Sequence, residues 1–200
     1  MKKTLLGILI LLMLPITLTP AFAAQEETWV QNESIGAYIP MYAPDETNPY
    51  PTYYQGPWRG VASLFVLRFD LKGLPQGVTI TSAKLELFCT RLLGIDRKDN
   101  KLVYDRITES WDETKVTANT QPKTAINDAI YADFPTVAMQ PYVVDLTPFV
   151  QGWYKGAFPN YGMLGRSQAV RPAETLNAGF VNSSNEKVQY RPKLTVTYLK

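Results

Sequence analysis

Two neighbouring stretches indicate the fold class: SLFVLRFDL at residues 63–71 and SAKLELFC at residues 82–89. Over most of each stretch, an apolar side chain occupies every second position. This period of two is typical of a β-strand with one buried face. Between them lies KGLPQG at residues 72–77, whose Gly and Pro residues favour a turn. We therefore expect two successive strands separated by a turn.

Shorter segments with the same alternation occur on both sides of this region. They span residues 35–42, 101–108, 142–146, 162–166 and 194–198. Helical periodicity is scarce between these segments. Many strands with few intervening helices favour an antiparallel β-sandwich over an α/β fold, because the apolar faces of the strands must then cover one another.

One short helix is expected within TPFVQGWYKG at residues 147–156. Thr147 suits the N-cap, Pro148 the first helical position and Gly156 the C-terminal stop. A helix this short must dock on the sandwich, because isolated helices of such length are unstable in water. The sequence therefore predicts an all-β fold with one short helix.

The first 23 residues have the pattern of a secretory signal. Lys2 and Lys3 form a basic start, an apolar run follows at residues 5–14, and small residues precede Ala23 in an A-x-A pattern. The apolar run is shorter than the ~20 residues that a membrane-spanning helix needs. We predict cleavage after Ala23, a single domain over residues 24–200, and a secreted, extracellular protein with no membrane contact after cleavage.

Composition excludes several classes of chemistry. The chain has no histidine and one cysteine in 200 residues. It therefore lacks Ser-His-Asp and Cys-His nucleophilic systems, histidine-ligated zinc and an internal disulfide. Without Lys2 and Lys3, the Lys+Arg total falls from 20 to 18 and equals the Asp+Glu total of 18. This neutral balance gives no indication of nucleic-acid binding, and we expect Cys89, on the apolar side of its strand, to be buried.

Four blocks of sequence carry a family resemblance. They are SLFVLRFDL with the following LP and SAKL (residues 63–85), TESWDE (108–113), VDLT with Val150, Trp153, Gly156 and NYG (144–162), and RPKLTVTY (191–198). In this order they resemble the DNRLRE-type domains, also classed as carbohydrate-binding module family 96 and related to the disaggregatase repeats. The resemblance covers residues 35–198. It implies a jelly-roll β-sandwich, usually extracellular, that binds polysaccharide, acidic alginate-like chains among the ligands.

The richest aromatic stretch is YPTYYQGPWR at residues 50–59. Aromatic rings stack on the CH faces of sugars, and planar polar groups bind sugar hydroxyls. The prolines of this stretch stiffen it, which lowers the entropy cost of presenting the rings. We predict ligand contacts from Tyr53, Tyr54, Trp58 and Arg59. The alternative is a packed loop that covers an open end of the sandwich with its rings buried.

Basic side chains on the polar faces of the strands are a second candidate. Arg68 and Lys84, with Arg106 as a further candidate, would line one sheet face and bind uronic carboxylates. The alternative is cross-strand pairing with Asp70 and Glu86, which the alternating signs of charge favour.

Acidic residues give only a weak indication of catalysis. A pair of carboxylates could hydrolyse a glycoside, and the carboxylates considered are those of Asp105, Glu109, Asp112, Glu113 and Asp145. Clustering around residues 109–113 is better explained as a turn, since short polar side chains bond to nearby backbone there. We therefore predict no enzymatic activity.

Calcium is a further possibility, because jelly-roll modules often hold a structural ion with carboxylate and carbonyl oxygens. The sequence contains no spaced calcium motif, and DRKDN at residues 96–100 is most simply a solvated hairpin tip. No cofactor is expected beyond a structural calcium ion.

These observations favour a secreted, non-catalytic module that recognises an extracellular or cell-wall polysaccharide, acidic chains included. The alternative is a structural or adhesive cell-envelope protein that contacts other cell-surface proteins. A binding module should expose an aromatic and basic patch, whereas a packing module should expose an apolar patch or a sheet edge.

Overall fold

The computed structural model describes residues 24–47, 50–58, 60–94, 100–168 and 176–200. The predicted signal and nearly all of the expected hairpin tip at residues 96–100 lie outside these ranges, so both stay predictions. Among the described residues, no helix is long and apolar enough to span a membrane.

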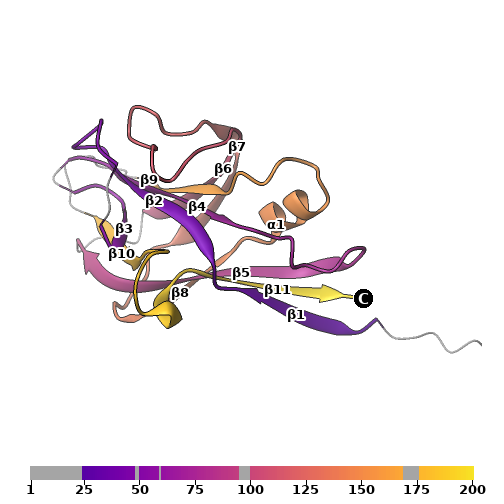
Figure 1. Cartoon of the computed structure of the whole chain (residues 1–200). Helices are drawn as coiled ribbons and strands as arrows, with labels where there is room; N and C mark the ends of the chain where they lie inside the picture. Colours follow the sequence, from indigo (N-terminus) through magenta and orange to yellow (C-terminus); the bar gives the residue numbers. More distant parts are fainter. Residues whose placement is uncertain (1–23, 48–49, 59, 95–99, 169–175) are drawn as a thin grey trace, which may run out of the picture.

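The chain folds into two antiparallel β-sheets that stack face to face (Figure 1). The six-stranded sheet has the order β1 (Glu26–Gln31), β11 (Lys193–Leu199), β5 (Thr79–Leu93), β10 (Asn177–Val181) and β3 (Thr52–Gln55), with β8 (Gln140–Asp145) paired to β5. The five-stranded sheet has the order β2 (Ser34–Pro40), β4 (Ser63–Phe69), β9 (Met163–Gln168), β6 (Lys101–Ile107) and β7 (Thr124–Asp133). The predicted antiparallel β-sandwich is confirmed, and its jelly-roll connectivity stays a prediction.

The main core lies between the two sheets and follows the alternation of the sequence. Phe65 and Leu67 of β4 belong to the same apolar cluster as Leu85 and Leu87 of β5, and each is at most 1% exposed. Burying a side chain of this size contributes roughly 1.5–3 kcal/mol. Cys89 is fully buried in the same cluster, as predicted.

A helix, α1 (Thr147–Tyr154), packs against the six-stranded sheet. Its buried residues are Phe149 and Val150, and the Gln151 side chain donates a hydrogen bond to the carbonyl of Ile80 in β5 at 2.8 Å. A 3-10 helix, η1 (Val188–Tyr190), precedes β11. The predicted short helix is therefore confirmed, and its position is set by docking on β5.

The start of α1 differs by one position from the prediction. Leu146 is the N-cap and Thr147 is already helical. Thr147 therefore does not cap the helix. Instead, the carboxylate of Asp145 accepts a hydrogen bond from the amide of Thr147, the first residue of the helix, at 2.9 Å. At the other end, Gly156 adopts a φ of 68°, consistent with the predicted stop.

Four strands lie outside the sequence-based expectation: β1, β3, β7 and β10. β3 has four residues and lies in the proline-rich stretch, whereas β10 is buried at all five positions. β3 alternates between half-buried and buried residues, but four residues are too few for this alternation to be recognised in the sequence, and β10 shows no alternation at all. The pairing of these strands was set by tertiary contacts.

β5 is 15 residues long and has three neighbours in its sheet. At Lys84 its partners lie in β11 and β8, and at Cys89 they lie in β10 and β8. β11 and β10 therefore occupy the same edge of β5, one after the other, while β8 occupies the opposite edge. The site described next lies beside β10.

Candidate ligand-binding site

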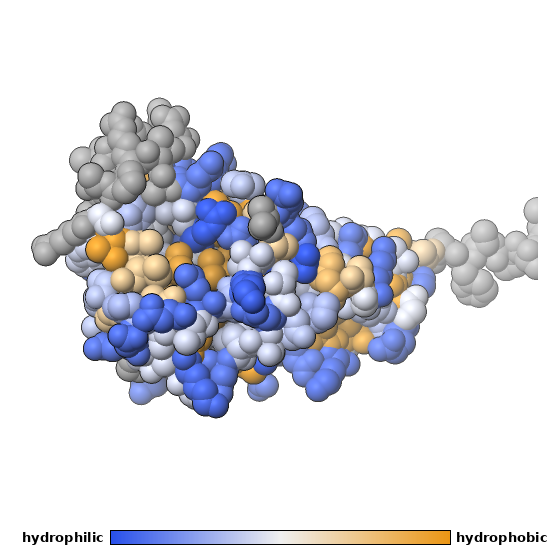
Figure 2. All heavy atoms as spheres, turned by 90° about the horizontal axis from the view of Figure 1, so that it is seen from above, coloured by the Kyte–Doolittle hydropathy of each residue, from blue (hydrophilic) through white to orange (hydrophobic). Residues whose placement is uncertain are grey.

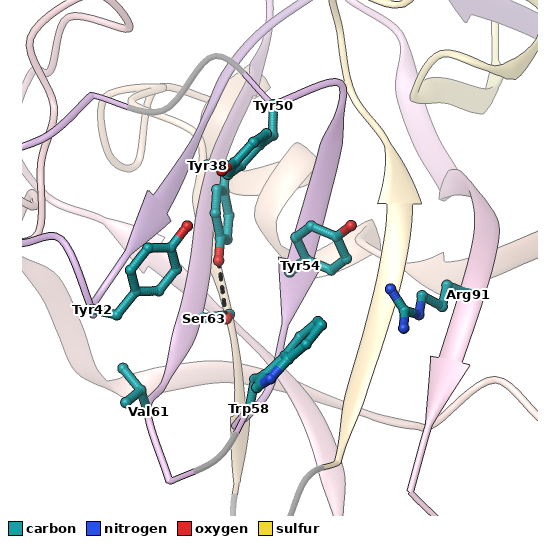
Figure 3. Close-up of a pocket in the computed structure, with 8 residues that line it drawn as sticks. All are labelled: Tyr38, Tyr42, Tyr50, Tyr54, Trp58, Val61, Ser63 and Arg91. Atoms are coloured by element: carbon teal, nitrogen blue, oxygen red, sulfur yellow. Dashed lines mark hydrogen bonds between the residues drawn. The ribbon is translucent and has the colours of Figure 1, made fainter.

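A pocket of about 440 Å³ opens beside β3, at the edge of the six-stranded sheet (Figure 3). We call it the aromatic pocket. Its aromatic lining consists of Tyr38, Tyr42, Tyr50, Tyr54 and Trp58. Val61, Ser63 and Arg91 complete the lining. These residues come from β2, β3, β4 and β5 and from the loops beside them, so the pocket depends on the packed sandwich.

A cross-strand row forms one wall of the aromatic pocket. In the hydrogen-bonded register, Gly179 of β10 lies between Tyr54 of β3 and Arg91 of β5. A Cβ atom on Gly179 would lie 3.1 Å from Cε1 of Tyr54, so the tyrosine ring lies over this glycine. The absence of a side chain on Gly179 thus lets the Tyr54 ring lie close to β10, and Figure 3 shows the Arg91 guanidinium pointing toward the Tyr54 and Trp58 rings.

Arg91 reaches this wall because β5 contains a β-bulge. Cys89 pairs with Phe180, whereas Arg91 pairs with Gly179, so Thr90 is an extra residue in the ladder. A bulge reverses the side-chain alternation beyond it. Strict alternation would have turned Arg91 inward with Cys89, and the bulge turns it outward instead. Arg91 was missed by sequence reasoning, and the one available signal was an arginine at an apparently inward position.

Trp58 forms the lower rim on the connection between β3 and β4. Its amide and carbonyl each bond to Val61, at 2.8 and 2.9 Å, which closes a tight turn. The indole is 37% exposed, and the Arg91 guanidinium lies 5.3 Å from the centre of its ring. This cation–π contact holds the indole beside the pocket while leaving part of its surface open.

Two buried asparagines position the rims: Asn177 is the first residue of β10, and Asn182 directly follows its last residue. Asn177 donates a hydrogen bond to the carbonyl of Gly56 at 2.9 Å, near Trp58. Asn182 donates to the carbonyl of Tyr50, also at 2.9 Å. β10 therefore ties both aromatic segments to the sheet, although its side chains do not line the pocket. A pocket fixed in this way needs little ordering when a ligand binds.

Tyr38 forms the back of the pocket. Its side chain is 3% exposed, and its hydroxyl lies 3.1 Å from that of Ser63. The Tyr54 ring meets it edge-on, with 5.6 Å between ring centres. Burial raises the pKa of the Tyr38 phenol above its ordinary value, so the phenol stays neutral at physiological pH.

The arrangement suits a ligand with apolar faces and polar edges. Tyr42, Tyr50 and Trp58 are 57%, 51% and 37% exposed and offer ring surfaces to solvent. Arg91 and the phenol hydroxyls supply hydrogen bonds in the same pocket. Sugars combine these two kinds of surface, and a guanidinium additionally fits a carboxylate bidentately.

The sequence-predicted aromatic residues separate into two groups. Tyr54 and Trp58 line the aromatic pocket. Tyr53 points to the opposite side of β3, is 1% exposed and stacks on Phe65 at 5.0 Å, so it belongs to the core and does not line the pocket. The predicted exposure of Tyr53 is therefore corrected, because neighbouring residues of a strand face opposite ways. Arg59 lies outside the described residues.

The predicted basic face is wrong. Arg68 lies on β4 and Lys84 on β5, which belong to different sheets. Arg68 lies over the ring of Trp111, 5.7 Å from its centre, whereas Lys84 pairs with Asp145 of β8. Their role in ligand binding stays a prediction, and the two cannot act on one face.

The predicted alternative pairing is also wrong in its partners. Asp70 pairs with Lys72 at 3.5 Å, and Glu86 pairs with Lys193 of β11 at 2.8 Å. Arg106 pairs with Asp128. Asp70 thus has a partner two residues away, whereas Lys84, Glu86 and Arg106 each pair with a neighbouring strand, as the sheet order sets.

The acidic cluster at residues 109–113 behaves as a turn. The carboxylate of Asp112 accepts the amide of Thr114 at 2.9 Å, and that of Glu109 accepts the amide of Lys123 at 2.9 Å. Hydrogen bonds from Thr114, followed by Lys115, lower the pKa of Asp112 to about 2. Within the described ranges, no group of three or more Cys, Asp or Glu side chains is placed to hold a metal ion.

Comparison with known proteins identifies the family. The model of carbohydrate-binding module family 96 matches residues 19–198, which is most of the chain. A comparison with curated proteins gives no significant match. The match agrees with the resemblance found in the sequence blocks and with the β-sandwich. The chain therefore belongs to carbohydrate-binding module family 96, a family of non-catalytic binding modules.

Proposed function

We propose that this chain is a secreted module that binds an extracellular or cell-wall polysaccharide in the aromatic pocket. The observation that carries the proposal is the convergence of five aromatic rings and Arg91 on one pocket. Family membership supports a carbohydrate as the ligand class. The signal pattern at residues 1–23 supports export.

Arg91 favours ligands that include acidic sugars. It is exposed and lines the aromatic pocket, so a uronic carboxylate could approach its guanidinium. Guanidinium–carboxylate pairs are stronger and more directional than hydrogen bonds between neutral groups. We therefore expect uronic polysaccharides to bind more tightly than neutral ones.

A structural or adhesive role is the second candidate, and one observation favours it. Tyr131, Val137 and Val143 are 58%, 53% and 53% exposed on and around β7 and β8. On the coloured part of the face in Figure 2, however, hydrophobic residues reach the surface in separate areas among polar ones. Protein interfaces more often use one larger apolar patch.

Affinity electrophoresis of residues 24–200 tests the proposal. The gels would contain alginate, polygalacturonate, xylan or a mixed-linkage β-glucan, each with and without a calcium chelator. We expect retardation by at least one uronic polysaccharide. Trp58→Ala should lower the affinity about tenfold or more, since buried aromatic anchors dominate binding energy. Tyr131→Ala, which removes an exposed ring far along β7, is the matched control.

Each result has a distinct meaning. Loss of retardation in Trp58→Ala but not in Tyr131→Ala supports the aromatic pocket. Equal retardation of both variants and the wild type would overturn this pocket as the site. Absence of retardation on every gel would overturn polysaccharide binding in favour of the protein-contact role.

A further inference from the structure

We propose that a second groove beside the aromatic pocket binds further sugar units of the same polysaccharide chain. This inference rests on the proposed function. We call the second site the distal groove; its volume is about 530 Å³, and Pro51, Phe88, Thr90, Met139, Val181 and Tyr190 contribute to its lining. Together, the two sites would recognise an internal stretch of several sugars and not a chain end.

The two sites open on the same face of the six-stranded sheet. Phe180 of β10 is buried in the core, so its neighbours Gly179 and Val181 both face outward. Gly179 lies in the wall of the aromatic pocket, and Val181 lines the distal groove. These two positions are about 7 Å apart along a strand.

The linings of the two sites are also continuous along the chain. Tyr50 lines the aromatic pocket and Pro51 the distal groove. Likewise, Arg91 lines the first and Thr90 the second. The sites therefore meet on both sides of β10, and a ligand leaving the aromatic pocket along this strand would enter the distal groove.

The distal groove contains a ring platform. Phe88 faces outward on β5, because Leu87 and Cys89 on either side of it are buried in the core. Tyr190 of η1 lies on it, with 4.4 Å between ring centres. The 3-10 helix fits here because β10 and β11 follow one another along the same edge of β5. The two ring planes are tilted by 38° to one another, and the pair gives the groove an aromatic surface of the kind that sugars stack on.

Met139 extends this apolar surface. Its side chain is 67% exposed. Its backbone has a φ of 61°, in the left-handed region that residues other than glycine seldom adopt. The conformation is held by a hydrogen bond from the Met139 amide to the carbonyl of Cys89 at 2.7 Å. An exposed apolar side chain kept in a costly conformation points to use in binding. Glu186 and Lys187 supply polar groups at the rim.

Oligosaccharides of increasing length test this inference by titration calorimetry. Two series would be used, from disaccharide to octasaccharide, one derived from alginate and one from xylan. For the wild type, we expect the affinity to rise until the oligosaccharide spans both sites. Tyr190→Ala should weaken binding of the longest oligosaccharides about tenfold and leave the shortest unchanged. Val188→Ala, on the exposed part of the same 3-10 helix, is the matched control.

Two further variants separate the possible failures. Met139→Asn removes the apolar side chain, and asparagine tolerates the left-handed backbone conformation. This variant should therefore weaken the binding of long oligosaccharides without unfolding the groove. Trp58→Ala should weaken the binding of short and long oligosaccharides alike. If both distal variants bind long chains as tightly as the wild type while Trp58→Ala does not, the distal groove is overturned and the aromatic pocket stands. If Trp58→Ala also has no effect, the proposed site itself fails.

Discussion

Two arginine–tryptophan pairs lie in different parts of the molecule and have nearly the same geometry. We call Arg91 with Trp58 the open pair and Arg68 with Trp111 the packed pair. The guanidinium lies 5.3 Å from the indole centre in the open pair and 5.7 Å in the packed pair. Despite this similarity, their surroundings give the two indoles different roles.

In the packed pair, the indole is part of the structure. Its N–H donates to the carbonyl of Tyr161 at 2.7 Å, and its ring packs against a second apolar cluster on the outer side of the five-stranded sheet. In the open pair, the indole is 37% exposed and borders the aromatic pocket. The comparison teaches that an Arg–Trp contact does not itself mark a binding site; what matters is whether the ring retains an open face beside a cavity.

The largest expected effect distinguishes the two indoles by stability. Trp111→Ala should lower the free energy of unfolding by about 2–3 kcal/mol, because it removes packing against the second cluster and a hydrogen bond. Urea unfolding measures this difference. Trp58→Ala should leave the free energy of unfolding nearly unchanged while lowering the affinity for the polysaccharide. Equal destabilisation by the two variants would break the comparison.

The arginines should differ in binding. Arg91→Lys should lower the affinity for a uronic polysaccharide by about fivefold, or roughly 1 kcal/mol. Lysine lacks the planar group that stacks on Trp58 and pairs bidentately with a carboxylate. Arg68→Lys is the matched control and should bind as the wild type does. Affinity electrophoresis on alginate gels measures both. A larger effect from Arg68→Lys would move the site to the packed pair.

The smallest expected effect concerns the turn that follows Trp111. The pKa of Asp112 is lowered to about 2 from an ordinary value of 3.8, chiefly by hydrogen bonds from Thr114. The carboxylate therefore stabilises the fold fully above about pH 4, and this contribution is lost as the pH falls toward 2. Asp112→Asn should lower the melting temperature slightly at neutral pH, with a difference that shrinks over this acid range.

Thermal melts of the wild type and Asp112→Asn at several pH values measure this effect. A difference that stays constant down to pH 2 would contradict the role of the Asp112 carboxylate in the turn. Ligand binding near neutral pH should be the same for both proteins, because Asp112 does not line the aromatic pocket.

Much of the fold could be predicted from local patterns. The alternation at residues 63–71 and 82–89 correctly located β4 and the centre of β5, since each has one face in the core. β3 and β10 could not be found in this way, because one is very short and the other is buried on both faces. These two strands also build the site, so the prediction of the site was weaker than that of the fold.

The candidate site shows the same limit at single residues. The aromatic stretch at residues 50–59 was correctly singled out, but composition could not separate Tyr53 from Tyr54, which face opposite sides of β3. Arg91 was missed, because one extra residue in the ladder at Thr90 reverses its direction, and its only signal was an arginine at an apparently inward position. Bulges arise where strands from distant parts of the chain pair, and local sequence records that pairing poorly.

The sequence by itself determined the class of fold and the family, because both the alternation and the four blocks that resemble the family can be recognised from local sequence. It also singled out the aromatic stretch at residues 50–59, which supplies several of the residues that line the site. Only the tertiary structure decided which rings remain open, which arginine joins them, and that β10 brings the aromatic pocket and the distal groove side by side. The physical reason is that side-chain direction on a strand is set by register, and register is settled only when strands distant in the sequence pair and bury a common core.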